Sequence, residues 1–353
     1  MLQSHFWRME LLWEGYLPKK LVTIRPVISL QRDYLTENKY KDLRTDIMKK
    51  FIITIDTEGD GQWNPDAPCS TENARFIPRF QELAEKYGFK PTWLTNYEMA
   101  EDPFYIEYMK DCLKRNTCEI GMHLHAWNNP PEYPLEKVND QRDYLFEYPE
   151  YIMDEKIHVL TEKLEDTFSI KMLSHRSGRW STDDTYFRLL RKYGYKYDCS
   201  VTPFMNWESC AGATGKPGSN YSNCPIHPYY IYDGILEVPV SIRPMKYIAT
   251  DAMQTLHSFA HELKWCRKER NVWLRPTKNP SFVALKKVLD AVSTDSDYAM
   301  FMLHSSEMMP GGSPSFPDEE SIKVLYECVE KLFAYVKQQG YVGCKLSDYT
   351  VED

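Results

Sequence analysis

Acidic residues and histidines form two short pairs at the ends of apolar runs, each pair with one residue between its members. Asp56 and Glu58 follow a β-branched run, and His123 and His125 close a second run. Residues two apart on an extended strand point to the same face, so each pair can share one site. A carboxylate with two imidazoles suits Zn²⁺ or another divalent transition metal and leaves positions open for water and substrate. The two pairs together predict a metal-dependent reaction.

Further polar residues close later apolar runs in the same way. His175 and Arg176 end one run, Asp198 lies near the end of the next, and His304 ends a late one. Barrel enzymes carry their catalytic groups at the carboxyl ends of parallel strands, so these side chains are expected to gather at one end of a barrel. Neighbouring strand residues alternate between faces, so His175 is expected to be structural if Arg176 faces the site.

The apolar pattern alternates between strand and helix along most of the chain. Expected strands cover 51–55, 91–95, 118–123, 171–176, 195–201, 235–242, 298–304 and 341–344, and expected helices cover 76–87, 105–113, 154–168, 183–193, 281–292 and 319–338. Seven or eight strands alternating with helices predict parallel β-structure with right-handed crossovers, in a closed or nearly closed (β/α) barrel. We expect residues 1–48 to form an N-terminal extension or cap, residues 49–353 to form the barrel, and residues 203–234 to form a loop insertion.

Composition excludes several classes of protein. The chain has 353 residues, 42% of them hydrophobic, and a formal net charge of −8. That balance excludes a mainly disordered chain, and the acidic charge argues against binding to nucleic acid. The mean hydropathy of −0.55 and the absence of an apolar run near twenty residues exclude a transmembrane helix. Nine scattered cysteines without a Cys-x-x-Cys pair, and the lack of a signal-peptide pattern, predict a cytoplasmic protein.

Four segments, taken in order, resemble the polysaccharide deacetylases, which are the NodB-homology or carbohydrate esterase family 4 enzymes. The segments are Ile55–Glu58, Glu119–Trp127, Ser174–Trp180 and Leu303–Glu307. The similarity covers about residues 50 to 346 and looks closest to the branch found in surface-polysaccharide gene clusters. The resemblance implies a distorted, NodB-like (β/α) barrel and metal-dependent hydrolysis of an acetamido group on a sugar.

The resemblance also implies roles for individual residues. It makes Asp56 the general base, Arg176 the arginine that holds this base, and His304 the general acid. It makes Glu58 and His123 metal ligands. Each of these assignments is an expectation about this chain.

The chain departs from the family pattern at three places. Thr57 separates the two acidic residues, which are usually adjacent, and residues 176–180 read Arg-Ser-Gly-Arg-Trp where Arg-x-Pro-x-Gly is usual. The usual second metal histidine lies about four residues after the first, where this chain has Trp127. We therefore expect His125 to be the second histidine ligand, because strand geometry allows it.

The expected function is removal of acetyl from an N-acetylated sugar of a surface polysaccharide or its precursor. Trp127, Arg179 and Trp180 are expected to bind the carbohydrate, with ordinary packing as the alternative for the tryptophans. One alternative function is hydrolysis of a cyclic amide or ureide. Another is a catalytically degenerate barrel that binds a glycan or a biosynthetic partner, an alternative motivated by the departures at Trp127 and Gly178. The sequence leaves the sugar, the metal and the oligomeric state open.

Overall fold

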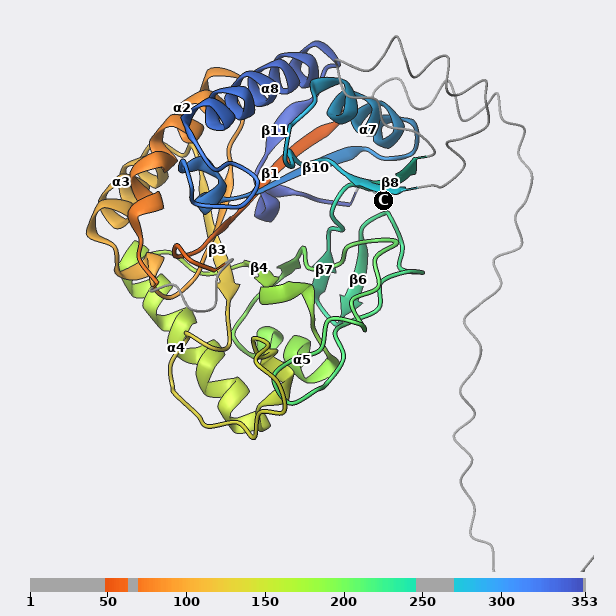
Figure 1. Cartoon of the computed structure of the whole chain (residues 1–353). Coiled ribbons are helices and arrows are strands. Elements are labelled where there is room, and N and C mark those ends of the chain that lie inside the picture. The colour runs from red at the N-terminus through yellow and green to blue at the C-terminus, as the bar shows by residue number, and fades with distance from the viewer. Residues whose placement is uncertain (1–47, 63–68, 246–269, 352–353) are drawn as a thin grey trace, which may run out of the picture. The chain divides into compact units, whose positions relative to one another are not determined.

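The computed structural model describes residues 48–62, 69–245 and 270–351. The expected N-terminal extension lies outside this part of the chain, apart from its last residue. The described strands are β1 (Lys50–Thr57), β2 (Thr92–Thr95), β3 (Glu119–Leu124), β4 (Ser174–Ser177), β5 (Tyr197–Asp198), β6 (Tyr229–Tyr232), β7 (Ile235–Glu237), β8 (Ile242–Met245), β9 (Arg270–Trp273), β10 (Tyr298–His304) and β11 (Val342–Cys344). The α-helices are α2 (Ile77–Lys86), α3 (Pro103–Lys114), α4 (Glu150–Phe168), α5 (Asp184–Lys192), α7 (Phe282–Asp295) and α8 (Glu319–Gln338) (Figure 1).

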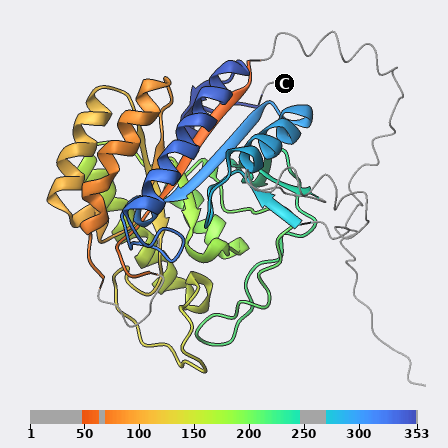
Figure 2. The same cartoon turned by 45° about the horizontal axis from the view of Figure 1, so that its top comes forward.

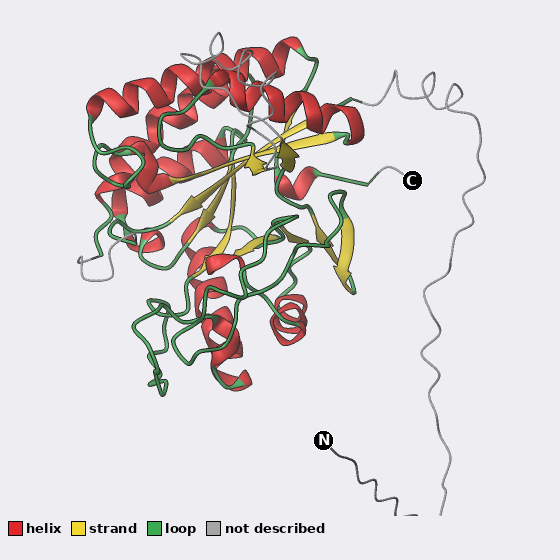
Figure 3. Cartoon of the chain, turned by 45° about the vertical axis from the view of Figure 1, so that its right-hand side comes forward, coloured by secondary structure: helices red, strands yellow, loops and turns green. Residues whose placement is uncertain are grey.

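Nine of the described strands form one curled, mostly parallel sheet. Its order is β10-β1-β2-β3-β4-β5-β7-β6, with β11 also paired to β1. All these pairings are parallel except that of β6 with β7. The helices lie outside the strands, as crossover connections require (Figure 3). The distorted (β/α) barrel expected from the sequence is therefore the observed fold.

In the described part of the barrel, β7 and β10 are not paired as neighbouring strands. Single hydrogen bonds from the segment that follows β7 bridge the gap between them. Met300 N donates to Ser241 Oγ at 2.9 Å, and Tyr298 Oη donates to Pro239 O at 2.6 Å. Leu274 N donates to Ser241 O at 2.9 Å. The wall is thus closed by residues that follow β7 and β9, which is the distortion of the barrel.

Two sequence expectations change in this region. The segment expected as one strand, 235–242, forms parts of β7 and β8, because Pro239 lies between them and has no N–H to donate to a ladder. The expected loop 203–234 contains β6, which pairs antiparallel to β7 with an irregularity between Tyr230 and Tyr232. β8 and β9 form a separate antiparallel pair.

Helix α8 packs against the two strands that carry Asp56 and His304 at their carboxyl ends. Phe333 of α8 is fully buried, and its ring lies edge-on to Phe51 of β1 and to Phe301 of β10, at 5.8 Å between centroids in each case. Figure 2 shows α8 running alongside these strands. Removing such a ring costs about 3–5 kcal/mol of stability. The parallel register that this packing supports places Asp56 beside His304.

Candidate metal and catalytic site

A buried ion pair joins the carboxyl ends of β1 and β4. Asp56 is 2% exposed and Arg176 is fully buried. Arg176 Nη1 donates to Asp56 Oδ1 at 2.5 Å, Nη2 donates to Thr54 Oγ1 at 2.8 Å, and Nε donates to Cys199 O at 3.0 Å. Burial opposes ionisation of Asp56, but the guanidinium outweighs it together with nearby histidines, so the pKa of Asp56 lies below its usual value. Asp56 is therefore an ionised carboxylate held in one orientation.

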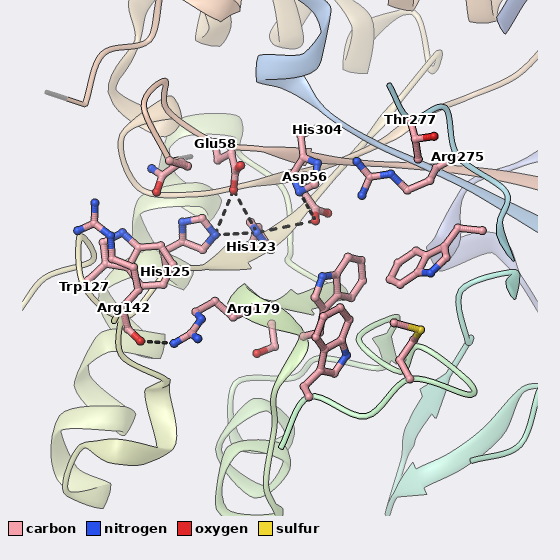
Figure 4. Close-up of a pocket in the computed structure, with 16 residues that line it drawn as sticks. Asp56, Glu58, His123, His125, Trp127, Arg142, Arg179, Arg275, Thr277 and His304 are labelled. Atoms are coloured by element: carbon pink, nitrogen blue, oxygen red, sulfur yellow. Dashed lines mark hydrogen bonds and ion pairs between the residues drawn. The ribbon is translucent and has the colours of Figure 1, made fainter. Parts of the chain in front are cut away.

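Glu58, His123 and His125 form a second cluster beside this pair (Figure 4). Glu58 Oε2 lies 3.1 Å from His125 Nε2 and 3.7 Å from His123 Nε2, and the two Nε2 atoms are 3.0 Å apart. All three side chains are buried, and their ligand atoms lie within 4.8 Å of one another. No other group of at least three His, Cys, Asp or Glu side chains in the described part of the chain meets this condition.

The tautomer of His123 suits metal binding. Its Nδ1 lies 2.9 Å from Arg176 O, and a carbonyl can only accept, so Nδ1 carries the proton and Nε2 of the neutral ring has a lone pair. Facing lone pairs on His123 and His125 would repel without a proton or cation between them. Burial lowers the pKa of His123, but Asp56 and Glu58 raise it above its usual value overall. The cluster thus favours positive charge, and its donors fit a divalent transition metal.

The backbone near His125 explains two of the sequence departures. A Cβ on Gly178 would lie 2.6 Å from both Leu124 O and His125 Cδ2, so only glycine fits at that position. The Trp127 ring stacks on the His125 imidazole with centroids 4.2 Å apart and planes at 26°. Trp127 therefore supports His125 from the place where the family usually has its second histidine.

His304 lies on the other side of Asp56. Its Nε2 is 3.7 Å from Asp56 Oδ2, and its Nδ1 is 3.1 Å from Glu307 Oε2. Arg275 Nη2 reaches both Glu307 oxygens, at 2.8 and 2.9 Å. Burial raises the pKa of Glu307, but Arg275 and His304 outweigh it and lower the pKa overall. Glu307 is thus an ionised group that orients the His304 ring.

Neither Glu307 nor Arg275 is among the site residues predicted from the sequence. The sequence contains a usable signal for Glu307, because this residue stands three positions after a strand-end histidine, the spacing of a capping box. In the structure, its side chain accepts a hydrogen bond from the His304 backbone N–H at 3.0 Å. The sequence contains no such signal for Arg275, because its partner, Glu307, is 32 residues away along the chain.

The two clusters open into a cavity of about 540 Å³. The expected substrate-binding residues Trp127, Arg179 and Trp180 all line it, and so do Trp207 and Trp273, which were not predicted from the sequence. The rings of Trp180 and Trp273 lie nearly edge-to-face, with centroids 5.4 Å apart. Such aromatic surfaces suit the apolar face of a sugar ring.

Arg179 and Trp180 hold an uncommon backbone conformation. Their φ angles are +56° and +62°, a left-handed region that costs about 1–2 kcal/mol for each non-glycine residue. Tyr221 Oη donates to Trp180 O at 2.6 Å, and Arg179 Nη2 donates to Ala211 O at 3.0 Å. These bonds keep both side chains on the cavity wall.

His175 and Asp198 lie outside the cavity lining, and the structural role expected for His175 agrees with its position. His175 is fully buried, with Nδ1 2.6 Å from Asp198 Oδ1 and Nε2 2.8 Å from Tyr186 Oη. Burial is the main reason that the pKa of His175 is lowered. Burial, followed by the Asp198 charge, raises the pKa of Glu237 well above its usual value, which favours the neutral acid. The network braces β4, β5 and β7.

Comparisons with known proteins find similarity to solved structures alone. No protein-family model and no curated protein sequence matches the chain. Similar solved structures include a family 4 carbohydrate esterase from Streptomyces lividans in complex with acetate, with a TM-score of 0.40, 9% identity, and coverage of 84% of this chain and 91% of that chain. The Xyl-CE4 domain of a xylanase from the hindgut metagenome of Trinervitermes trinervoides has a TM-score of 0.38 and 9% identity, covering 85% and 88%.

A pseudoenzyme of the same family from Bacillus anthracis has a TM-score of 0.41 and 10% identity, covering 85% of this chain and 64% of that chain. All three belong to carbohydrate esterase family 4, the family that the sequence motifs resemble. One fold can host many functions, so this similarity concerns the fold alone. In the described residues, no helix has the length and apolar character needed to span a bilayer.

Proposed function

We propose that the chain is a metal-dependent deacetylase that hydrolyses an N-acetyl group on a sugar of a surface polysaccharide or its precursor, in the cytoplasm. The observation that carries this proposal is the convergence of three groups on Asp56. Arg176 holds its Oδ1, while His304 Nε2 and His123 Nε2 lie 3.7 and 4.0 Å from its Oδ2. Asp56, the proposed base, thus lies beside His304, the proposed acid, and beside His123, a proposed metal ligand.

Asp56 is suited to accept a proton from water. The guanidinium of Arg176 keeps the carboxylate ionised, and it fixes the direction of Oδ1 because its other nitrogens are held by Thr54 and Cys199. Glu58, His123 and His125 would hold the metal, which, when bound, polarises a carbonyl and makes water more acidic. Asp56 Oδ2, the oxygen that faces the two histidines, is the atom that takes the proton.

His304 is suited to donate a proton to the leaving nitrogen. Glu307 accepts from Nδ1 and so directs Nε2 toward Asp56 and the cavity. Hydrolysis breaks the amide C–N bond, adds the elements of water, and releases acetate and a free amino sugar. His304 supplies the proton that the departing amine requires.

The test measures acetate release from N-acetylglucosamine oligosaccharides by zinc-loaded protein. We expect turnover in the parent protein and a loss of about 10²–10⁴-fold in Asp56→Asn and His304→Ala, the range for removal of a general base or acid. His158→Ala is the matched control, because this histidine is on α4 outside the cavity lining and pairs with Glu162. No acetate from any N-acetylated sugar, beside an active reference enzyme, refutes the proposal.

Other products of the same assay identify the alternatives. Ammonia or a ring-opened product without acetate, from cyclic amide or ureide substrates, identifies the amidohydrolase. Glycan binding that persists unchanged in the Asp56→Asn, His304→Ala double variant, with no turnover in the parent, identifies a binding protein.

A further inference from the structure

Outside the catalytic clusters, the cavity wall is rich in hydrogen-bond donors and poor in acceptors. Arg142, Arg179 and Arg275 supply guanidinium groups, which only donate. The side-chain acceptors there are those of Gln62, Ser177 and Thr277. Neutral sugar hydroxyls need both donors and acceptors, so this wall suits a ligand with additional acceptor oxygens.

The charge of Arg179 is not neutralised by a carboxylate in the described part of the chain. Its two Nη atoms donate to the carbonyls of Arg142 and Ala211, and its guanidinium lies 4.1 Å from the Tyr144 ring centre. Carbonyl groups orient a guanidinium without cancelling its positive charge. Arg275, in contrast, is paired with Glu307. Arg179 is therefore a fixed cation on the cavity wall.

A second arginine lies on the same side of the cavity. The Arg142 guanidinium is 5.5 Å from the ring centre of Trp127, and the Arg142 carbonyl is the group that Arg179 binds (Figure 4). The whole chain carries a net charge of −8, so the two arginines make this part of the cavity wall more positive than the chain as a whole. The acids of the cavity lining, Asp56 and Glu58, face histidines on the catalytic side.

We propose that Arg179 and Arg142 form an anion subsite, and that the sugar substrate carries a carboxylate or phosphate group near its N-acetyl group. This inference rests on the proposed function, which it deepens by naming the substrate class. Guanidinium groups match the paired oxygens of carboxylates and phosphates, and the hydrogen bonds of Arg179 to the carbonyls of Arg142 and Ala211 hold its side chain in place before the ligand arrives. The neighbouring tryptophans would contact the sugar rings.

The test measures binding without turnover, by tryptophan fluorescence and calorimetry on metal-free full-length protein. The probes are hyaluronan tetrasaccharide, which has carboxylates, UDP-N-acetylglucosamine, which has phosphates, and neutral chitotetraose. At least one acidic probe should bind about tenfold more tightly than chitotetraose at low salt, because charge-assisted hydrogen bonds are the stronger ones. The preference should shrink at about 0.5 M salt. Tighter binding of the hyaluronan tetrasaccharide identifies the anion as a carboxylate, and tighter binding of UDP-N-acetylglucosamine identifies it as a phosphate.

Chitotetraose binding as tightly as both acidic probes, or no binding of either acidic probe, overturns the inference. Arg179→Gln should reduce the preference about fivefold or more, and Arg142→Gln, which leaves the Arg142 carbonyl in place, tests the subsite if Arg179→Gln does not fold. Arg188→Gln is the control, because Arg188 pairs with Glu150 outside the cavity lining. A preference that survives in both cavity variants also overturns it.

Acetate release from zinc-loaded protein is measured separately on the same probes. Selective binding of an acidic probe without acetate release supports the subsite and counts against the deacetylase proposal. Acetate release from chitotetraose without any preference for acidic probes supports the deacetylase and overturns the subsite.

Discussion

Replacing Asp56 with asparagine should destabilise the protein, apart from its effect on catalysis. The asparagine side chain would keep one oxygen near Arg176 Nη1 but would remove the charge that balances a fully buried guanidinium. Breaking a buried ion pair at one partner costs about 3–5 kcal/mol. Because the amide still accepts a hydrogen bond, we expect about 3 kcal/mol, which is a fall of about 6 °C in Tm for a domain of this size.

The assay is thermal unfolding of metal-free protein, followed by circular dichroism at several pH values. Asp56 has a folded pKa below the value of 3.8 expected in the unfolded chain, so its stabilisation is present above that pH and is lost as the pH falls toward the folded pKa. The Tm difference between parent and variant should therefore be full at pH 7 and shrink in acid below about pH 4.

Two controls isolate the buried pair. Asp111→Asn breaks an exposed pair with Arg115, at 2.7 Å, and should change Tm by about 1 °C or less. Arg176→Met should cost less in the Asp56→Asn background than in the parent, because the unbalanced charge is then removed. A Tm for Asp56→Asn within about 1 °C of the parent at pH 7 would refute the reasoning.

Three further substitutions test two residues of the site and one of the buried network behind it. His125→Ala should abolish the retention of about one zinc per chain after loading and desalting, measured by mass spectrometry, whereas His158→Ala should retain it. Glu307→Gln should lower kcat for acetate release about 10-fold or more with little change in KM, because the His304 ring loses its charged partner; an unchanged kcat would contradict that role. Glu237→Gln should become more stable relative to the parent as the pH rises above about 4.5, by at most ~1.4 kcal/mol per pH unit, because only the parent must keep a proton that its unfolded chain releases. Parallel Tm curves from pH 5 to 7 would count against a neutral Glu237.

The sequence predicts most of the fold because its strong signals are local. Buried strands and amphipathic helices are visible in residue order, and Gly88, with φ of +74°, follows the end of α2 as expected. The wall between β7 and β10 was not predictable in this way. It depends on contacts such as that of Met300 with Ser241, which no local pattern encodes.

The same distinction holds for the candidate site. The pairing of His123 with His125 follows from strand alternation, and the structure brings both rings to Glu58. The position of Arg275 beside Glu307 depends on two distant segments meeting, so spacing gave no indication of it. Trp207 and Trp273 were missed for the same reason, since an isolated tryptophan carries no sign of which cavity it lines.

The burial of Arg176 has a consequence for how this site can change in evolution. Its guanidinium is fully buried, so solvent cannot take the place of a lost carboxylate, and a mutation at Asp56 would impair folding as well as the proposed reaction. A lineage that abandoned the reaction would gain stability by also exchanging Arg176 for an apolar residue. Positions 56 and 176 are therefore expected either to be substituted together or both to be retained.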